Sequence, residues 1–534
     1  MHRWSTVDRV HPRPVSAAGC CRCSGRTRGG PMRDHAVVVG AGVAGLSAAI
    51  RLATLGMSVD LVEAAATPGG KAGVVVLDGV AVDTGPSVLT LPDAFDGVLL
   101  PAGTRLREEV RLRRHSPAFR YRYPDGSVLD VHHDVEETLA SVGRSFGPGA
   151  ARDLEDYLAA VARIWEIAAP AFIEGPAPTV SAVLSRGWTG LRLLAGVDPL
   201  RAMQRAVNRQ VRDERLRWLL WRYATYNGSD VRRAPATLGC IAHVELALGG
   251  FGVEGGMASL VDALVRVATR CGVQVHCGRA VTRILSRGGV VAGVELVGGT
   301  VLPALVVVFA GDVGALSSLA PGTAWPRRRQ AASMSAWTGI LRAARQADRV
   351  PHEVLFPQQY QREFEDIFDH DRPPVDPTIY VCAQEPCHGR RGWPQHEPLF
   401  VMTNAPAWRG ASADDSDAWT VHAESLVDRI AAHGLSEPGD RFAWTRTPAQ
   451  LAAAYPGSDG ALYGPASNTL SAAFRRAPNR IVSQPGLYLA SGSAHPGGGL
   501  PLAAMSGLQA ALCAAEDLGL ADPAHPFFPQ VATC

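Results

Sequence analysis

The sequence predicts a mixed α/β fold made of two intertwined domains. An apolar strand at 37–39 runs into the turn GAGVAG at 40–45 and then into a helical pattern that reaches Leu55. A continuous apolar run at 304–310 is typical of a strand buried in a parallel sheet. The chain has 534 residues, more than one ordinary core holds, so two domains are expected.

The turn at 40–45 has the spacing of a dinucleotide-binding fingerprint, with Gly40, Gly42 and Gly45 around Ala44. The glycines permit a tight turn, a close approach of the backbone to a pyrophosphate and close packing of helix on strand. Glu63 follows the next apolar strand, at 59–62. In this fingerprint an acidic residue at that position binds a ribose hydroxyl of the dinucleotide. A tight turn without a ligand is the alternative, but this order of strand, turn, helix, strand and acid favours a binding site.

Composition excludes several classes of protein. Lysine and arginine number 52 against 50 acidic residues, so a net charge of +2 gives no reason to expect a nucleic-acid partner. Hydrophobic residues reach 47%, yet no stretch of about 20 residues is apolar enough to span a membrane.

The ten cysteines predict reduced thiols in a cytoplasm and no metal site. Cys20, Cys21 and Cys23 lack a second cluster that would complete a tetrahedral ligand set. The spacing of Cys382, Cys387 and His388 is by itself a poor signal for metal ligands.

Residues 1–32 are expected to be a disordered leader or to precede the true translation start. Residues 1–31 hold six arginines against one acid, with many Pro, Gly and Ser. An organelle-targeting segment has this composition. Translation that begins at Met32, directly before the first strand, is the interpretation we favour.

Turn and strand signals then follow in order. Residues 83–86 (DTGP) close the first section, and YPDG at 123–126 predicts a hairpin between strands at 119–123 and 128–131. Asp134 with Glu137 predicts a capping box. A largely helical block extends to about 226, with breaks at 147–149 and 175–178. A second strand-rich section covers 273–312, a mixed, Pro-rich section covers 325–464, and a last strand at 486–490 precedes GGG at 497–499.

Four motifs resemble the FAD-dependent carotenoid desaturases of the bacterial phytoene desaturase type. They are GGK at 69–71, GGM at 255–257, VHCGRAVTRI at 275–284 and LYLASGSAHPGGGLPLAAMSG at 487–507, and the resemblance covers roughly 34–518. It implies a Rossmann-like FAD-binding domain of the flavin amine oxidase type, assembled from 33–115, 230–320 and 480–520. A substrate domain, associated with the membrane, would be formed by 116–229 and 321–479.

The resemblance also implies which residues bind FAD. Gly70, Gly85 and Lys71 would lie near the diphosphate, with Lys71 where many relatives carry Arg. The backbone of Val281 would hold the adenine. At the other end, the glycine run would seat the isoalloxazine ring beside Gly492 and Ser493, and the helix that starts at Leu500 and Pro501 would point its positive end at the ring.

Stretches at 222–228, 376–384 and 455–464 resemble one branch of the family, the hydroxyneurosporene or methoxyneurosporene desaturases. This implies formation of the 3,4 double bond of a 1-hydroxylated acyclic carotenoid, with Tyr226, Asn227 and Tyr463 as candidates to bind the hydroxyl. Phytoene desaturation and carotenoid isomerisation are alternatives within the family. From other classes, a flavin amine oxidase and a flavin-free prenyl-binding chaperone stay open.

The same resemblance implies hydride removal by FAD, for which His495 and Glu245 are the catalytic candidates. No second dinucleotide fingerprint is visible, so a quinone or oxygen is the expected electron acceptor. Since carotenoids lie in bilayers, we expect a cytoplasmic protein bound peripherally to the membrane; the sequence does not indicate its oligomeric state. Two apolar segments could contact lipid or belong to the core: residues around Trp188, Leu193 and Leu194, and the run 216–221.

Overall fold

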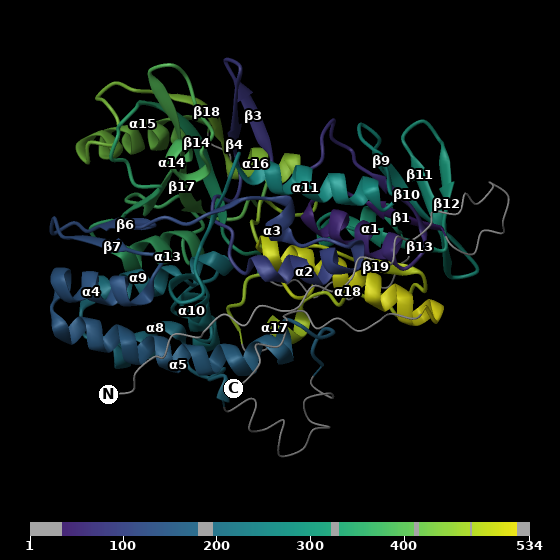
Figure 1. Ribbon diagram of the computed structural model, residues 1–534, viewed down its shortest axis with the longest axis horizontal. Helices are drawn as coiled ribbons and strands as arrows, with labels where there is room; N and C mark the ends of the chain where they lie inside the picture. The colour runs from purple at the N-terminus through teal and green to yellow at the C-terminus, as the bar shows by residue number, and fades with distance from the viewer. Residues whose placement is uncertain (1–34, 180–195, 322–330, 411–415, 470–471, 521–534) are drawn as a thin grey trace, which may run out of the picture.

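The computed structural model describes residues 35–179, 196–321, 331–410, 416–469 and 472–520. Within these residues two large sheets lie toward opposite ends of the long axis of the molecule, and helices pack around both (Figure 1). The leader expected at 1–32 and the apolar segment around Trp188 lie outside the described residues. The domain boundaries given above stay a prediction.

The first sheet is parallel and contains, among the described residues, five strands in the order β19-β13-β1-β2-β9. They are β1 (His35–Val39), β2 (Ser58–Val62), β9 (Gln274–His276), β13 (Val306–Phe309) and β19 (Leu487–Leu489). The buried strand expected at 304–310 is confirmed, because all four residues of β13 are buried. The strand order reverses at β1, and parallel sheets bind ligands at the carboxyl ends of their strands at such a point.

Helices from distant parts of the chain cover this sheet. They are α1 (Val43–Thr54), α11 (Met257–Arg270) and α18 (Leu500–Leu518), with the short η1 (Pro92–Phe95), α2 (Asp96–Leu99), η2 (Leu100–Ala102) and α3 (Leu106–Glu109). The first helix, α1, packs against the last, α18. A Cβ atom on Gly507 would lie 2.2 Å from the carbonyl oxygen of Ala44, so glycine permits this close approach.

The second sheet has the order β18-β14-β17-β16-β15-β6-β7 within the described residues, and its only parallel pair there is β15 with β6. Its strands are β6 (Phe119–Arg122), β7 (Val128–Val131), β14 (Ser335–Ala344), β15 (His352–Leu355), β16 (Ile379–Ala383), β17 (His396–Ala405) and β18 (Phe442–Arg446). The predicted hairpin is confirmed, since β6 and β7 pair antiparallel across the YPDG turn.

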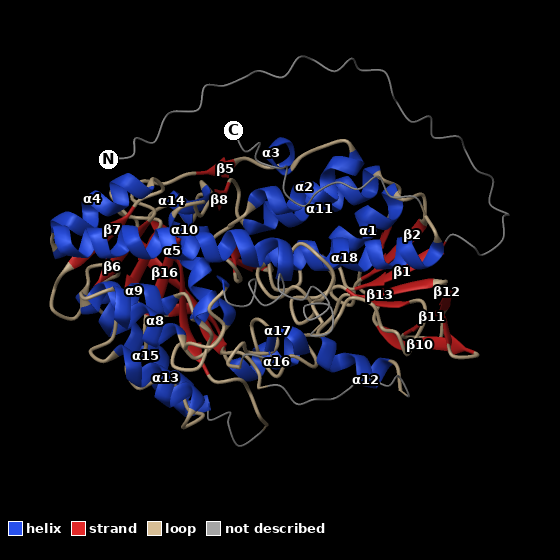
Figure 2. Cartoon of the chain, turned by 90° about the horizontal axis from the view of Figure 1, so that it is seen from below, coloured by secondary structure: helices blue, strands red, loops and turns tan. Residues whose placement is uncertain are grey.

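Most of the remaining helices surround this second sheet (Figure 2). They are α4 (Val135–Phe146), α5 (Pro148–Phe172), α8 (Met203–Gln210), α9 (Glu214–Arg222), η3 (Thr225–Asn227), η4 (Ala236–Gly239), α10 (Cys240–Leu246), α13 (Tyr360–Phe368), α14 (Gln384–His388) and α15 (Ser416–Ala432). Two further helices, α16 (Pro448–Ala454) and α17 (Ala472–Arg475), lie near the middle of the molecule (Figure 2). The predicted breaks at 147–149 and 175–178 are confirmed, because α4 ends at Phe146 and α5 at Phe172.

Asp134 caps α4, but the expected capping box is wrong in its second half. The carboxylate of Asp134 accepts hydrogen bonds from the backbone N–H groups of Glu136 and Glu137. The Glu137 side chain does not reach back to the cap; it accepts a hydrogen bond from the Ser116 hydroxyl at 2.8 Å. Tertiary contact with the segment before β6 therefore replaces the local contact.

The run 216–221 belongs to the core, which confirms the second of the two alternatives for this segment and rules out a lipid-facing surface there. Leu216, Leu219, Leu220 and Trp221 of α9 are all buried, in one hydrophobic cluster with Tyr121 of β6. The helix is amphipathic because it covers the sheet. No helix among the described residues is long and apolar enough to cross a bilayer.

Three small sheets and two short helices complete the described elements. They are β10 (Val281–Arg287) with β11 (Val290–Leu296) and β12 (Val301–Pro303), β3 (Val74–Leu77) with β4 (Val80–Asp83), β5 (Leu112–Arg113) with β8 (Gly252–Val253), and the helices η5 (Val313–Ala315) and α12 (Leu316–Leu319).

Candidate functional site

The fingerprint loop joins β1 to α1 at the carboxyl edge of the parallel sheet. Gly40 has a φ of 106°, and a Cβ on Gly45 would lie 1.9 Å from the Gly40 carbonyl oxygen. The N-cap of α1 is Gly42, which has no capping side chain, and the first turn, which includes Ala44, has no acidic residue. The N–H groups at this helix start are therefore available to an anion from outside the helix.

Two further glycine-containing loops meet the fingerprint. The backbone N–H of Gly69 donates to the Ala41 carbonyl, and a Cβ on Gly70 would lie 3.3 Å from the Gly42 Cα. A Cβ on Gly85 would lie 2.0 Å from the carbonyl oxygen of Lys71. The structure thus brings the predicted residues Gly42, Gly70 and Gly85 into one layer of closely packed backbone.

Glu63 is held at the end of β2, beside the fingerprint. Its Oε2 accepts a hydrogen bond from the Ala41 N–H at 2.6 Å, and its Oε1 accepts one from the Ala65 N–H at 2.8 Å. The Glu63 carbonyl accepts from the N–H of Arg279, two residues before Val281 begins β10. Glu63 and the chain that leads to Val281 therefore lie side by side, as the two contacts of one adenosine group require.

A second uncapped helix start lies at the same edge of the sheet. The N-cap of α18 is Gly499, which has a φ of 107°, no capping side chain and no acid in the following turn. A Cβ on Gly499 would meet no atom within 4 Å, so there is open space in front of the buried first-turn residues Leu500 and Pro501. This end of α18 can receive a second polar group.

Partly buried charges lie beside these loops. Lys71 donates from Nζ to the carbonyls of Ala461 at 2.9 Å and Leu462 at 3.0 Å, and it interacts with Asp312, which follows β13. Burial lowers the pKa of Lys71 and raises the pKa of Asp312. The position of Asp312 after a predicted buried strand is the one sequence signal that could have found it.

Arg476 is a further cation and is buried, and no sequence signal indicated it. It donates to the carbonyl oxygens of Gly492 and Tyr463 at 3.0 and 3.2 Å, and its guanidinium lies beside Gly497. Burial lowers its pKa to about 10. The neighbouring Ser493 Oγ accepts a hydrogen bond from the Val313 N–H at 2.9 Å. The cations Lys71 and Arg476 both lie close to these loops, and positive charge of this kind suits an anionic ligand.

The residues present fit FAD. A dinucleotide needs an uncapped helix start without acids for its diphosphate and an acid for a ribose, which α1 and Glu63 supply. A flavin ring needs close backbone approach and a positive environment, which the glycine run, α18 and Arg476 supply.

His495 has a structural contact in this loop. Its Nε2–H donates to the carbonyl of Gly175 at 2.9 Å, and burial lowers its pKa to about 4, so the ring is neutral at physiological pH. Gln509 of α18 likewise donates to the carbonyl of Glu174 at 2.8 Å. Both contacts hold the chain after α5 against the end of the parallel sheet, and a catalytic role for His495 stays a prediction.

A buried polar cluster surrounds Arg222 at the end of α9. The Arg222 guanidinium donates to the Tyr226 hydroxyl at 2.7 Å and lies over the rings of Tyr226, Tyr121 and Tyr380. Glu245 of α10 accepts a hydrogen bond from the Tyr223 hydroxyl at 3.0 Å through Oε1, whereas its Oε2 is buried and makes no hydrogen bond. An unpaired buried carboxylate oxygen points to a ligand or a reaction at this position.

Tyr463 connects this polar cluster to the glycine run. It is partly buried and interacts electrostatically with Arg222, and a Cβ on Gly498 would lie 2.8 Å from its ring. Of the three residues predicted to bind a hydroxyl, Tyr226 and Tyr463 thus both interact with Arg222. The third, Asn227, accepts a hydrogen bond from the Ser229 hydroxyl at 3.2 Å. Arg222 begins the stretch 222–228, but nothing in the sequence indicates that it lies at the centre of the cluster.

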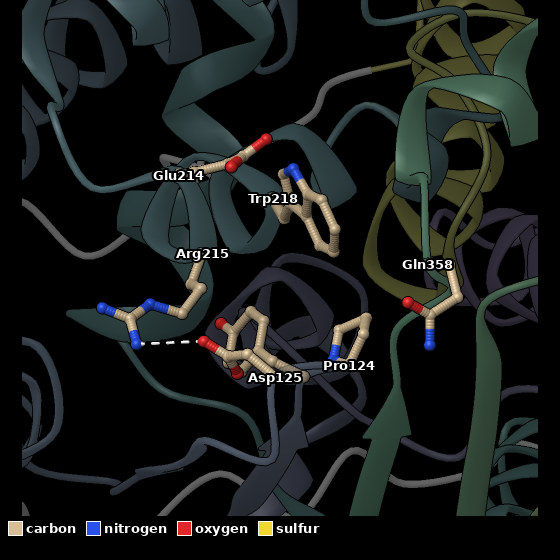
Figure 3. A pocket seen from close by; sticks show the side chains of 7 residues that line it. Pro124, Asp125, Glu214, Arg215, Trp218 and Gln358 are labelled. Atoms are coloured by element: carbon tan, nitrogen blue, oxygen red, sulfur yellow. Dashed lines mark hydrogen bonds and ion pairs between the residues drawn. The ribbon is translucent and has the colours of Figure 1, made fainter.

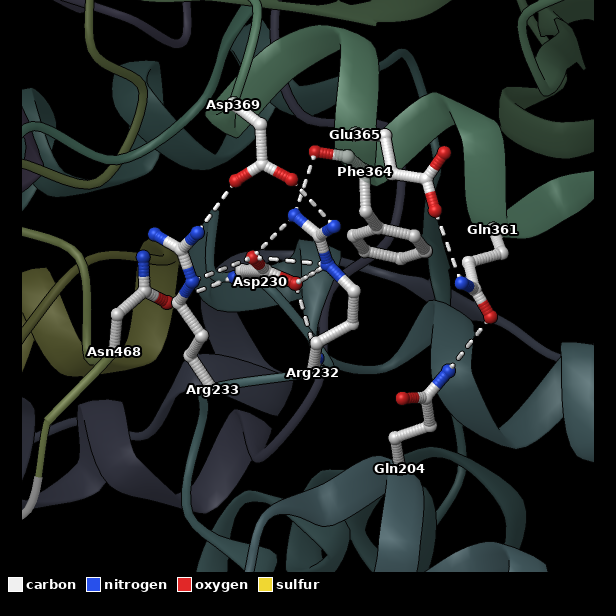
Figure 4. Close-up of polar contacts among 9 residues, drawn as sticks. All are labelled: Gln204, Asp230, Arg232, Arg233, Gln361, Phe364, Glu365, Asp369 and Asn468. Carbon is white, nitrogen blue, oxygen red and sulfur yellow. Dashed lines mark hydrogen bonds and ion pairs between the residues drawn. The ribbon is translucent and has the colours of Figure 1, made fainter.

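An ionic network fixes the segment that follows this cluster (Figure 4). Asp230 is completely buried, and Arg232 donates to it from Nε and from one terminal nitrogen, at 2.9 and 2.8 Å. Arg232 and Arg233 both reach Asp369, just after α13, while the Asp230 N–H donates to Asn468. The backbone that carries Tyr226 and Asn227 is therefore tied to two other parts of the fold.

A shallow pocket of about 280 Å³ lies elsewhere, between the β6–β7 turn and α9 (Figure 3). Trp218 and Gln358 line it, with Arg215 and Asp125 paired at 3.3 Å across its edge. Figure 1 places this turn at the end of the molecule away from β1. Because the pocket is open and far from the glycine-rich loops, we do not assign redox chemistry to it.

Comparison with known proteins agrees with this geometry. A family model described as flavin containing amine oxidoreductase matches residues 43–514. A hydroxyneurosporene desaturase of Rubrivivax gelatinosus is 37% identical over 498 residues, which cover 90% of this chain and 93% of that protein. A hydroxyneurosporene desaturase of Cereibacter sphaeroides is 35% identical, with 90% and 97% of the two chains covered. A 4,4'-diapolycopene oxygenase of Methylomonas sp is 29% identical over 89% of this chain and 96% of that protein.

Solved structures confirm the predicted fold class. Putrescine oxidase bound to putrescine superposes with a TM-score of 0.59 at 15% identity, over 91% of this chain and 99% of that chain. Cyclohexylamine oxidase from Brevibacterium oxydans gives a TM-score of 0.57 at 15% identity, over 92% and 100%. At these identities the likeness concerns the fold alone.

Proposed function

This chain belongs to the flavin-containing amine oxidoreductase family and is an FAD-dependent oxidoreductase, and from that premise we propose that it is a carotenoid desaturase. Its reaction would introduce a carbon–carbon double bond into an acyclic carotenoid, at the 3,4 position of a 1-hydroxycarotenoid. The observation that carries the substrate assignment is the buried polar cluster of Arg222, Tyr226 and Glu245, which Tyr463 joins to the glycine run.

Bound FAD supplies the oxidant that accepts a hydride. The N–H groups at the start of α1 would bind its diphosphate, Glu63 a ribose hydroxyl, and the backbone of Val281 the adenine. Gly492, Ser493 and the start of α18 would seat the ring, and Arg476 would stabilise negative charge there. Lys71 would hold the loop at 69–71 against the carbonyls of Ala461 and Leu462, and Gly85 would let the chain after β4 pack on the backbone of Lys71.

The polar cluster suits a terminal hydroxyl group at the end of an apolar chain. A hydroxyl that leaves water without a partner loses about 1–3 kcal/mol, so a 1-hydroxycarotenoid needs a buried donor or acceptor. Tyr226 is oriented by the Arg222 guanidinium, and Tyr463 interacts with Arg222 and packs next to Gly498 of the glycine run. We assign hydroxyl binding to Tyr226 and Tyr463; Asn227, already bonded to Ser229, would support the turn.

Desaturation also requires loss of a proton from the carbon next to the one that loses the hydride. In this substrate the carbon that bears the hydroxyl is two bonds from the first carbon of the new double bond, so both events fall near one cluster. Glu245 Oε2 has no hydrogen-bond donor and can accept a proton there, while Tyr223 holds Oε1. We therefore rank Glu245 above His495 as the candidate proton acceptor, because the His495 ring is already hydrogen-bonded to the Gly175 carbonyl.

The membrane and the electron acceptor complete the proposal. Carotenoids are held in bilayers, so the enzyme would work as a peripheral membrane protein on the cytoplasmic side, with a quinone or oxygen to reoxidise the flavin. Flotation with liposomes tests the first part: Leu193→Ser with Leu194→Ser is expected to reduce binding and to keep the flavin spectrum. Unchanged flotation would contradict a role for this segment.

Incubation of the holoenzyme with separate carotenoids tests the substrate. A 1-hydroxy acyclic carotenoid should give a 3,4-didehydro product with a red-shifted polyene absorption, and phytoene should give little. The reverse result would assign phytoene desaturation, and a spectral change without loss of two hydrogen atoms would assign isomerisation. Turnover of amines alone would assign an amine oxidase, and a colourless protein a prenyl-binding chaperone.

A matched pair of variants tests the hydroxyl contact. Tyr226→Phe removes only the hydroxyl that Arg222 orients, so kcat/KM for the hydroxylated carotenoid should fall about 5- to 150-fold, equivalent to about 1–3 kcal/mol. Tyr157→Phe removes a buried hydroxyl in α5 outside the cluster and should leave kcat/KM unchanged. Equal effects of the two variants would contradict the assignment.

A further inference from the structure

Two cysteines and a histidine converge inside the second sheet, outside the residues assigned to FAD or substrate. His352 begins β15, Cys382 lies directly opposite it on β16, and Cys387 follows in α14. One ligand atom from each, an imidazole nitrogen or a sulfur, lies within 4.8 Å of the other two, and all three residues are buried. The sequence spacing of the cysteines gave a poor signal because His352 comes from 30 residues earlier in the chain.

The distances match a tetrahedral zinc centre. Zinc binds thiolate sulfur at about 2.3 Å and imidazole nitrogen at about 2.0–2.1 Å, so two such ligands at a tetrahedral angle are separated by about 3.5 Å. Cys387 Sγ lies 3.5 Å from His352 Nε2. Two thiolates balance the charge of a divalent ion, so the filled site would place no net charge in the core.

The surroundings of His352 orient it for this role. Its Nδ1 lies 2.8 Å from the hydroxyl of Tyr380, and its ring stacks on Phe119 at a centroid distance of 4.6 Å. When Nδ1–H donates to that hydroxyl, the lone pair of Nε2 faces the two sulfur atoms. Histidine ligands of metals are held by an outer hydrogen bond of this kind.

A second imidazole, that of His388, lies next to Cys382 and accepts a hydrogen bond from the Val253 N–H at Nδ1, at 3.3 Å. Its other nitrogen, Nε2, therefore carries the proton of the neutral ring and has no lone pair for a metal ion, so we do not count His388 among the ligands.

We propose that Cys382, Cys387 and His352 bind one zinc ion that fastens the second sheet to the segments next to the FAD site. Cys387 Sγ lies 3.8 Å from the Ser87 carbonyl, and its own carbonyl lies 3.0 Å from His115 Nε2. The Gln384 side chain makes two hydrogen bonds to the backbone of Asp83, at 2.8 and 3.0 Å. The ion lies in the middle of these connections, and three protein ligands leave its fourth coordination position for a small ligand.

The metal content of the full-length holoenzyme tests this proposal. Protein purified without metal-affinity resin and dialysed against a weak chelator should contain about one zinc per chain by mass spectrometry. Cys382→Ser and Cys387→Ser should each lose most of it, whereas Cys240→Ser, which removes a buried thiol of α10, should keep it. Wild-type protein with no more zinc than the two variants would overturn the proposal.

Two further measurements keep the test decisive if the variants fail to fold. Growth with Co²⁺ should give the wild-type protein thiolate charge-transfer bands and weak bands to the red of the flavin absorption. A strong chelator should lower the Tm of the wild type, and added zinc should restore it. Wild-type protein without cobalt bands and with an unchanged Tm contradicts a metal site. One copper ion per chain in place of zinc would overturn the choice of metal.

Discussion

Replacement of Gly507 by alanine tests whether the contact of α1 with α18 controls FAD binding. The new Cβ would lie 2.2 Å from the carbonyl oxygen of Ala44 and 2.8 Å from the backbone nitrogen of Ala48. Ordinary contacts of Cβ begin near 3.4 Å, so the first distance must grow by 3.4 − 2.2 = 1.2 Å. Both atoms belong to the backbone of α1, so no side-chain rotation can provide this space, and the helices must separate.

Overpacking of this kind typically costs about 1–3 kcal/mol. Since the proposed FAD site includes the starts of both α1 and α18, we expect the strain to weaken FAD binding about 5- to 150-fold, with a lower Tm of the apoprotein. Fluorescence titration of apoprotein with FAD measures the first effect and thermal unfolding the second. The control is Gly143→Ala in α4, whose Cβ would lie 3.7 Å from the Ala151 Cβ and which should be neutral or stabilising. If Gly507→Ala retains wild-type affinity and Tm, the helices do not approach as described.

Three other predictions concern the same sheet and the core. Gly42→Val should reduce FAD retention more than Glu63→Ala does. The valine places branched carbons where we propose that the diphosphate binds, while the alanine removes one hydrogen-bonding group worth about 1.5–3 kcal/mol. Full flavin occupancy of the Gly42 variant at low FAD would contradict this binding site. A hydrogen bond to Asp60 raises the pKa of His35, so the stabilisation from this pair should be complete below about pH 6.5 and be lost as pH rises through the raised pKa. Asp60→Asn should remove that slope in urea unfolding from pH 6 to pH 8, and an unchanged slope would assign it to another group. Leu220→Ala should reduce the free energy of unfolding by about 2–5 kcal/mol, as expected for a core residue. A change below about 0.5 kcal/mol would show that this face of α9 is not part of the core.

The sequence predicted those parts of the fold that depend on local conformation. The fingerprint, the break at Gly147 and the hairpin turn each use glycine or proline for a backbone geometry that other residues disfavour. Such signals are readable without knowledge of the partner segment. The fingerprint loop was predicted in this way, whereas the other loops proposed to bind FAD were implied by the family resemblance. The packing of Gly85 on Lys71 shows why glycine is required at that position.

The parts that sequence could not predict depend on contacts between distant segments. Arg476 has no local signal, and its function comes from the carbonyl oxygens of other loops that surround it. The unpaired oxygen of Glu245 is recognised only once α10 is seen packed against α5. The apolar run of α9 has the same pattern whether lipid or a sheet covers it, so only the position of Tyr121 decides between them.

The order of strands in the parallel sheet has a consequence for synthesis of the chain. β1 ends at Val39, while its sheet is completed by β19 and covered by α18, which ends at Leu518. At about 5–20 residues per second, a ribosome needs about 20–100 s to make the chain between these points. During that time the first strand and helix are outside the ribosome without their final neighbours, and the nascent chain cannot yet capture its flavin. A messenger truncated before the last few dozen codons would therefore yield a colourless polypeptide with exposed apolar surface, a substrate for chaperones and proteases.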